Sequence, residues 1–124
     1  MDNVRWKVTD PLGNELRLSE ENFVHHIIVQ HDPKDAEIRA KIEPQARFAL
    51  EHPRFIVRNM QHSGRVKYLN LTNIQEGKEI YIRTIAVVVD AANEVVTCFA
   101  RRTINDVLTE GDIVYDERHN NLQV

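Results

Sequence analysis

Apolar and polar side chains alternate in two short segments near the start of the chain. Residues 4–9 alternate, and residues 15–18 alternate again after a gap. A period of two is typical of a half-buried β-strand. The gap, residues 10–14, contains Asp, Pro, Gly and Asn, which favour tight turns. The pattern therefore predicts an N-terminal β-hairpin over residues 1–18.

Between residues 20 and 51 the apolar residues change to helical spacing. Ser19 is a suitable N-cap for a first helix over about residues 20–30. The Asp32-Pro33 step ends this helix, because the residue before a proline is displaced from the helical region. One stripe of the helix carries Val24, Ile27, Ile28 and His31.

A second helical region covers residues 34–51, where Ile38 and Ile42 stand four positions apart. Pro44 conflicts with a continuous helix, because proline removes a hydrogen bond and clashes with the preceding turn. It either kinks the helix or occupies the first turn of a new one, where its missing N–H does no harm.

The remainder of the chain is typical of antiparallel strands. Strand-like runs occupy residues 54–58, 66–71, 79–90 and 94–100. The second half of the run 79–90 is continuously apolar, which predicts a central strand covered on both faces. Residues 73–78 are polar and predict a turn, and residues 91–93 predict the turn of a hairpin. Residues 104–108 are compatible with a short helix or a final edge strand, and the polar end from Asp116 is expected to fray.

This order of elements predicts the α+β fold class, in which helices are segregated on one face of an antiparallel sheet. We expect the hairpin and two to three helices to pack on one face of a sheet of at least four strands. Residues 1–124 are expected to form a single domain, with its core in about residues 4–103 and a C-terminal tail over residues 104–124. The predicted core residues are Phe23, Ile27, Ile28, Ile38, Ile42, Leu50, Ile56, Ile85, Val87, Val89, Val96 and Phe99.

Composition narrows the class of protein. Hydrophobic residues make up 42% and charged residues 28%, as in ordinary globular domains. No apolar run approaches the ~20 residues of a membrane helix, and the N-terminus lacks the apolar stretch of a signal peptide. The single cysteine, Cys98, excludes an internal disulfide and fits a reducing compartment or a chain that needs no disulfide. A cytoplasmic location is expected. A net charge of −3 argues against a strongly basic nucleic-acid binder, although a local basic patch remains compatible with it.

Histidines are the main candidates for chemistry, because an unperturbed pKa of about 6.5 lets the imidazole take and give protons near neutrality. The first predicted helix carries His25, His26 and His31. Their spacing is not the zinc-binding His-Glu-x-x-His pattern, and there is no second cysteine, so no metal site is predicted. The sequence also lacks a glycine-rich phosphate loop and the nucleophile motif of serine hydrolases.

Three segments carry a resemblance to a known group of proteins. Residues 23–33 read Phe-x-x-His-Ile-x-x-x-His-Asp-Pro, residues 49–56 read Ala-Leu-Glu-His-Pro-Arg-Phe-Ile, and residues 95–102 read Val-Val-Thr-Cys-Phe-Ala-Arg-Arg. In this order they resemble the motifs of phage-associated nuclease-like domains. Those domains belong to the barnase, EndoU, colicin and RelE group, called the BECR fold.

The resemblance implies a barnase-like fold and a metal-independent endoribonuclease without a cofactor, of phage or mobile-element origin and toxin-like. Its partners would be RNA, with tRNA among the candidates, and an immunity protein or antitoxin. Such enzymes activate the ribose 2′-hydroxyl and leave a cyclic phosphate, so they need a base, an acid and donors for the phosphate.

The same resemblance assigns roles to individual residues. His26 and His31 would supply the base and the acid. Thr97 would donate a hydrogen bond, and Arg101 and Arg102 would hold the phosphate through their guanidinium groups. Further substrate contacts, on the same face of the sheet, would come from Lys67, Tyr68 and Arg83.

Each of these residues also has a purely structural interpretation. His31 at a helix end is compatible with a C-terminal cap, and His26 with packing or exposure on the surface. Arg101 and Arg102 are compatible with a charged strand end, and Thr97 with ordinary strand preference. A second hypothesis is therefore a catalytically inactive domain of the same fold that acts as a binding module. The acidic pI of about 6.1 favours that hypothesis, because phosphate contacts supply most RNA affinity.

Overall fold

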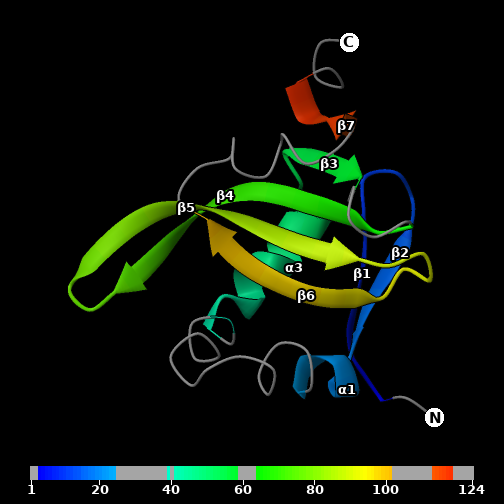
Figure 1. Ribbon diagram of the computed structural model, residues 1–124, viewed down its shortest axis with the longest axis horizontal. Coiled ribbons are helices and arrows are strands. Elements are labelled where there is room, and N and C mark those ends of the chain that lie inside the picture. The colour runs from blue at the N-terminus through cyan, green and yellow to red at the C-terminus, as the bar shows by residue number, and fades with distance from the viewer. Residues whose placement is uncertain (1–2, 25–38, 40, 59–63, 102–112, 119–124) are drawn as a thin grey trace.

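Two antiparallel sheets and two helices make up the part of the chain that the computed structural model describes, residues 3–24, 39, 41–58, 64–101 and 113–118 (Figure 1). The elements are β1 (Val4–Thr9), β2 (Glu15–Ser19), α1 (Glu20–Asn22), α3 (Glu43–Glu51), β3 (Phe55–Arg58), β4 (Val66–Glu76), β5 (Glu79–Val89), β6 (Val95–Arg101) and β7 (Ile113–Asp116). The predicted α+β class is confirmed. None of the described helices is long and apolar enough to span a membrane.

The predicted N-terminal hairpin is formed by β1 and β2, which pair antiparallel. Its turn is built around Asp10, whose Oδ1 accepts hydrogen bonds from the backbone N–H groups of Leu12 and Asn14 at 3.0 and 2.7 Å. Gly13 supplies the left-handed backbone that this turn requires, with φ of 88°. The local turn chemistry thus fixes where the strand reverses.

The predicted start of the first helix is present, and the structure decides between the two alternatives for Pro44. The Ser19 hydroxyl accepts a hydrogen bond from Asn22 N at 3.0 Å, which confirms it as the N-cap of α1. The rest of the predicted first helix, residues 25–30, lies outside the described residues. Pro44 lies in the first turn of α3, so it begins a new helix and does not kink a continuous one.

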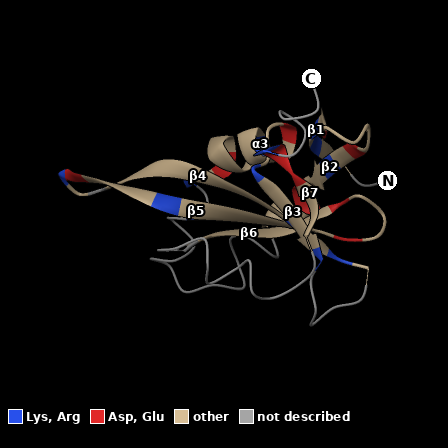
Figure 2. Cartoon of the chain, turned by 90° about the horizontal axis from the view of Figure 1, so that it is seen from above, with Lys and Arg blue, Asp and Glu red and all other residues tan. Residues whose placement is uncertain are grey.

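The larger sheet has five strands in the order β6-β5-β4-β3-β7, and every neighbouring pair is antiparallel. The second half of β5, Thr84–Val89, is buried between β4 and β6, as its apolar run predicted. Helix α3 and the β1–β2 hairpin lie on the same side of this sheet (Figure 2). β4 and β5 extend beyond the other strands and continue, paired with each other, as a two-stranded ribbon (Figure 1).

The main core lies between the sheet, α3 and the hairpin. Six predicted core residues are buried there: Ile42, Leu50, Ile56, Ile85, Val87 and Val89. Phe23 is half-buried against this cluster, and Ile27, Ile28 and Ile38 lie outside the described residues. A smaller cluster on the opposite face of the sheet contains Phe55, Val57, Leu69 and Ala86, with Phe99 half-buried beside it.

The prediction that Val96 belongs to the core is wrong, because the register between β5 and β6 shifts next to this residue. Val88 pairs with Thr97, whereas Val89 pairs with Val95. The shift leaves Val96 as the extra residue of a bulge. Val95 is therefore 1% exposed, while Val96 is only half-buried.

Two strand boundaries also differ from the predictions. The predicted turn at residues 73–78 is mostly strand, because β4 continues to Glu76 and only Gly77 and Lys78 turn the chain. The sheet also extends beyond the predicted core boundary at about residue 103. β7 lies in the predicted tail, and it pairs with β3 as the edge strand of the described sheet.

Candidate functional site

Strand β6 carries the third motif of the resemblance, and its side chains alternate between the two faces of the sheet. Cys98 pairs with Val87 and belongs to the core under α3. Its neighbours Thr97 and Phe99 therefore lie on the opposite face. We call this surface the Thr97 face; it contains Thr97, Phe99 and Lys67. Position 101 pairs with Thr84 and is four residues after Thr97, so the alternation along β6 assigns it to the same face.

Lys67 is the second predicted residue on the Thr97 face. The register links Lys67 of β4 to Val88 of β5 and Val88 to Thr97 of β6. Lys67 and Thr97 are thus two strands apart, about 10 Å across the sheet. Lys67 is only 6% exposed, so its chain is largely covered. A cation and a hydroxyl share one row of the sheet.

Arg39 is a candidate site residue that the sequence did not indicate. Its Nη1 donates hydrogen bonds to Thr97 Oγ1 at 3.0 Å and to the backbone oxygen of Cys98 at 2.8 Å. The guanidinium carbon lies 5.9 Å from the centre of the Phe99 ring. Arg39 therefore brings a permanent positive charge to the hydroxyl of the strand motif. The only sequence feature that could have drawn attention to Arg39 is its position directly after Ile38, which was predicted to lie in the core.

Tyr68 does not contribute to the Thr97 face. It pairs with Val87, it is 3% exposed, and its hydroxyl donates a hydrogen bond to Asp10 Oδ2 at 2.5 Å. Burial raises the pKa of Tyr68, and the hydrogen bond to Asp10 raises it further. The hydroxyl is thus a neutral core donor that is committed to the hairpin turn.

Arg83 lies apart from both groups, on the ribbon. It pairs with Thr72, and its guanidinium carbon lies 4.5 Å from the centre of the Tyr81 ring. Successive residues of β4 point to opposite faces, and Arg83 shares the face of Tyr68. The prediction that Lys67, Tyr68 and Arg83 line one face is therefore wrong.

His26, His31 and Arg102 lie outside the described residues, as does the side chain of Arg101. Their approach to Thr97 stays a prediction. His52 is described, and it lies at the end of α3 with its ring 5.0 Å from that of Phe48. Cys98 is 2% exposed, and burial raises the pKa of its thiol to about 12. Because a neutral thiol is a poor nucleophile, the buried Cys98 thiol is unsuited to nucleophilic chemistry.

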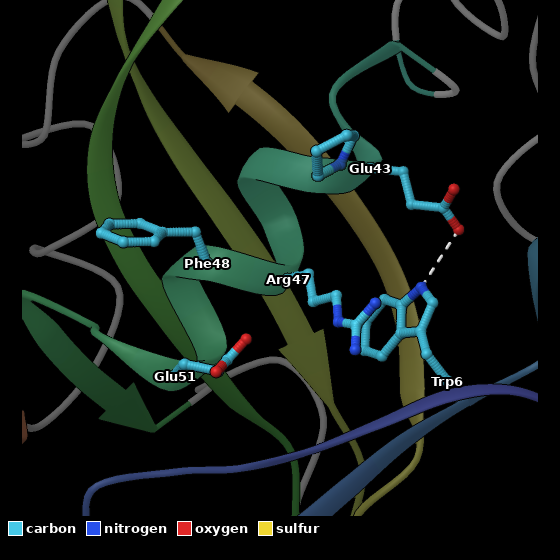
Figure 3. A pocket seen from close by; sticks show the side chains of 6 residues that line it. Trp6, Glu43, Arg47, Phe48 and Glu51 are labelled. Carbon is cyan, nitrogen blue, oxygen red and sulfur yellow. Dashed lines mark hydrogen bonds between the residues drawn. The ribbon is translucent and has the colours of Figure 1, made fainter.

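A hollow that the sequence did not predict lies on the α3 side of the sheet. It has a volume of about 360 Å³ and is lined by Trp6, Glu43, Pro44, Arg47, Phe48 and Glu51 (Figure 3). Trp6 and Arg47 come from β1 and α3, and the Arg47 guanidinium carbon lies 5.7 Å from the indole. Phe48 is 55% exposed at its rim. The hollow thus combines aromatic surface with charge.

Glu43 closes one end of this hollow. Its carboxylate accepts hydrogen bonds from Trp6 Nε1 at 3.1 Å and from Arg5 Nη2 at 2.9 Å, and it also pairs with Arg5 Nε. Burial opposes ionisation of Glu43, but these hydrogen bonds outweigh it and hold the pKa of Glu43 below its ordinary value. The carboxylate is therefore an ionised link between α3 and β1.

No group of three or more His, Cys, Asp or Glu side chains that could hold a metal ion occurs among the described residues. Comparison with known protein families, curated proteins and solved structures finds no match for the chain. The two surfaces differ in the chemistry of their side chains. The Thr97 face carries a hydroxyl and a guanidinium, groups that suit an anion such as a phosphate. The α3 hollow offers ring faces and a carboxylate.

Proposed function

We propose that this chain is a metal-independent RNA-cleaving domain of the barnase-like BECR fold. Its site would lie where the Thr97 face meets the histidine segment, residues 25–31. The contact between the Arg39 guanidinium and the Thr97 hydroxyl carries the proposal, because it puts a phosphate-binding group on the strand motif of the resemblance. The order of the three motifs along the chain supports it as well.

The proposed reaction needs no group beyond the side chains of the chain. One histidine, His26 or His31, takes the proton of the ribose 2′-hydroxyl, and that oxygen attacks the adjacent phosphorus. The bond from phosphorus to the 5′ oxygen breaks, and the other histidine protonates the leaving oxygen. The products are a 2′,3′-cyclic phosphate and a free 5′-hydroxyl.

Cationic groups would stabilise the negative charge that develops on the phosphate oxygens. Arg39 and Lys67 are candidates among the described side chains, and Arg101 and Arg102 are candidates from the strand motif. Removing Arg39 should therefore slow cleavage and also weaken RNA binding. A partner that masks this cationic site, such as an immunity protein or antitoxin, would have an acidic surface.

A binding module of the same fold is the second candidate function. The α3 hollow favours it, because the exposed ring of Phe48 and the Trp6–Arg47 pair offer stacking surface without an acid–base pair. The net charge of −3 also favours a role that does not depend on RNA affinity alone.

An RNA cleavage assay with chelator present separates the two candidates. We expect wild-type protein to cleave and to leave cyclic phosphate ends, with a bell-shaped pH profile. His26→Ala or His31→Ala should each slow cleavage by about 10²–10⁴-fold without unfolding the domain. His52→Ala is the matched control, because His52 lies at the end of α3 and outside the proposed site.

Cleavage that survives His26→Ala and His31→Ala together would overturn the proposed mechanism. RNA binding without cleavage would favour the binding module. In that case Trp6→Ala and Phe48→Ala should weaken binding, and Arg39→Ala should leave it unchanged.

A further inference from the structure

The ribbon formed by the ends of β4 and β5 leaves one backbone edge without a described neighbour. β6 pairs with β5 from Thr84 to Val89, while β4 accompanies β5 as far as Glu79. Among the strands that the structure describes, none pairs with Glu79–Arg83 on the side away from β4. A strand edge without a neighbour among the described strands presents N–H and C=O groups with which another strand can pair.

Exposed aliphatic side chains accompany this edge. Ile80 and Ile82 are 69% and 66% exposed, and both lie on the face of the ribbon opposite Tyr81. Leu71 lies on the same face of the neighbouring strand and is 41% exposed. Proteins usually blunt free edges with proline, a bulge or charges. The five residues Glu79–Arg83 contain no proline, and their pairing with β4 has no register shift.

The charges on this edge select a partner. The segment reads Glu79-Ile80-Tyr81-Ile82-Arg83. An isoleucine stands on each side of Tyr81, and the two end residues carry opposite charges. Tyr81 donates a hydrogen bond to Glu79, and Arg83 lies over the Tyr81 ring, so the three side chains follow one face. A second copy of the same segment, laid antiparallel, is complementary to it.

We propose that the chain forms a homodimer through this edge, with Glu79–Arg83 of one copy paired antiparallel to the same segment of the other. The two-fold axis passes beside Tyr81, so that Tyr81 faces Tyr81 of the second copy. Glu79 then faces Arg83 of the second copy, at both ends of the pair. The four isoleucines, two from each copy, form one cluster on the opposite face. The turn at Gly77 and Lys78 ends the pairing.

The corresponding edge of β4 is a poorer partner. There the residues beyond the pairing with β3, Asn70–Glu76, carry a single charge, Glu76, and centring them on Asn73 places Leu71 opposite Gln75. Neither charge nor apolar surface is matched in that arrangement. The complementarity of the β5 segment therefore favours one register of pairing. The proposed dimer does not depend on RNA cleavage.

Sedimentation velocity over a concentration series tests the dimer with a charge swap. Arg83→Glu or Glu79→Arg alone puts like charges opposite each other at both ends and should raise the dimer Kd by about tenfold. The double variant E79R/R83E should restore the wild-type Kd. Lys78→Glu is the matched control, because it changes a charge in the turn, outside the paired segment, and should leave the Kd unchanged.

Crosslinking tests the register in a Cys98→Ala background. Directly opposed residues have Cα atoms about 4.5–5.5 Å apart, within the about 4.4–6.8 Å range of disulfides. Tyr81→Cys should therefore form an intermolecular disulfide under mild oxidation, whereas Ile80→Cys should not, because its opposite residue is Ile82. A monomer at all concentrations, a dimer that ignores both charge reversals, or equal crosslinking at both positions would overturn the proposal.

Discussion

The hydroxyl of Tyr68 donates a hydrogen bond to the carboxylate of Asp10, 58 residues earlier in the chain. Asp10 is 4% exposed, and its two oxygens also accept hydrogen bonds from backbone and side-chain groups of the hairpin turn. This contact connects the turn between β1 and β2 to the first residues of β4. It gives a polar link within a core that is otherwise formed by apolar packing.

Tyr68→Phe should lower the free energy of unfolding by about 1–3 kcal/mol. The variant keeps the ring in the core but removes one hydrogen bond to a buried carboxylate, and a hydrogen bond to such a group contributes about 1–3 kcal/mol. Denaturant titration followed by circular dichroism measures the change.

Tyr81→Phe is the control for that measurement. It removes a hydrogen bond between Tyr81 and Glu79 that lies on the exposed ribbon. Exposed contacts of this kind contribute little, so a change within about 0.5 kcal/mol is expected at protein concentrations that keep the chain monomeric. Equal losses in the two variants would show that the buried carboxylate does not depend on Tyr68.

Two neighbouring valines test the bulge in β6. Val95→Ala should cost about 2 kcal/mol, because Val95 is 1% exposed in the main core. Val96→Ala should cost less than about 1 kcal/mol, because Val96 is only half-buried. Thermal and denaturant unfolding of the two variants measure the difference. The reverse order of costs would show that the register of β6 is shifted by one residue.

The sequence predicted those parts of the fold that depend on local pattern. Alternation gave the N-terminal hairpin and the central position of β5, and Ser19 and Pro44 marked helix starts. The long end of β4 was missed, because its polar residues resemble a turn and are held in a strand by pairing with β5. β7 was missed for a similar reason, since its partner β3 lies more than 50 residues earlier.

The candidate site shows the same division between local and distant information. The strand motif identified Thr97, but its contact with Arg39 joins residues 58 positions apart. Tyr68 matched the chemistry of a substrate-binding residue, and only the contact with Asp10 reveals it as part of the core. A one-residue step along β4 separates Lys67 from Tyr68 by a whole sheet face.

Glu43 should make stability depend on pH in the acidic range. The pKa of Glu43 is below its ordinary value of 4.5 in the folded protein, so its stabilising effect is present above that value. The effect is lost as the pH falls through the lower folded-state pKa. Unfolding titrations of the wild type and Glu43→Gln should therefore differ most near neutral pH and converge in acid.

Glu15→Gln is the control for the pH titration. Glu15 forms an ion pair with Lys7 at 3.6 Å, but both side chains are more than half exposed. Its substitution should change stability little at any pH. A difference between wild type and Glu43→Gln that stays constant from neutral pH into acid would contradict an ionised Glu43 linking α3 to β1.

Cys98 should react with thiol reagents only when the domain opens. Its thiol is 2% exposed, and burial raises its pKa from the ordinary 9.0 to about 12, so little thiolate forms near neutral pH. We expect the rate of labelling by a chromogenic disulfide to rise with denaturant in parallel with the unfolded fraction. Leu12→Cys in a Cys98→Ala background is the matched control, because Leu12 is 54% exposed on the hairpin turn and should be labelled at once.

The raised pKa of Cys98 also predicts that the neutral thiol favours the folded state below pH 9.0 and that this contribution is lost as the pH rises towards 12. The stability difference between wild type and Cys98→Ala should therefore shrink in alkali, and immediate labelling of native Cys98 would contradict its burial in the core.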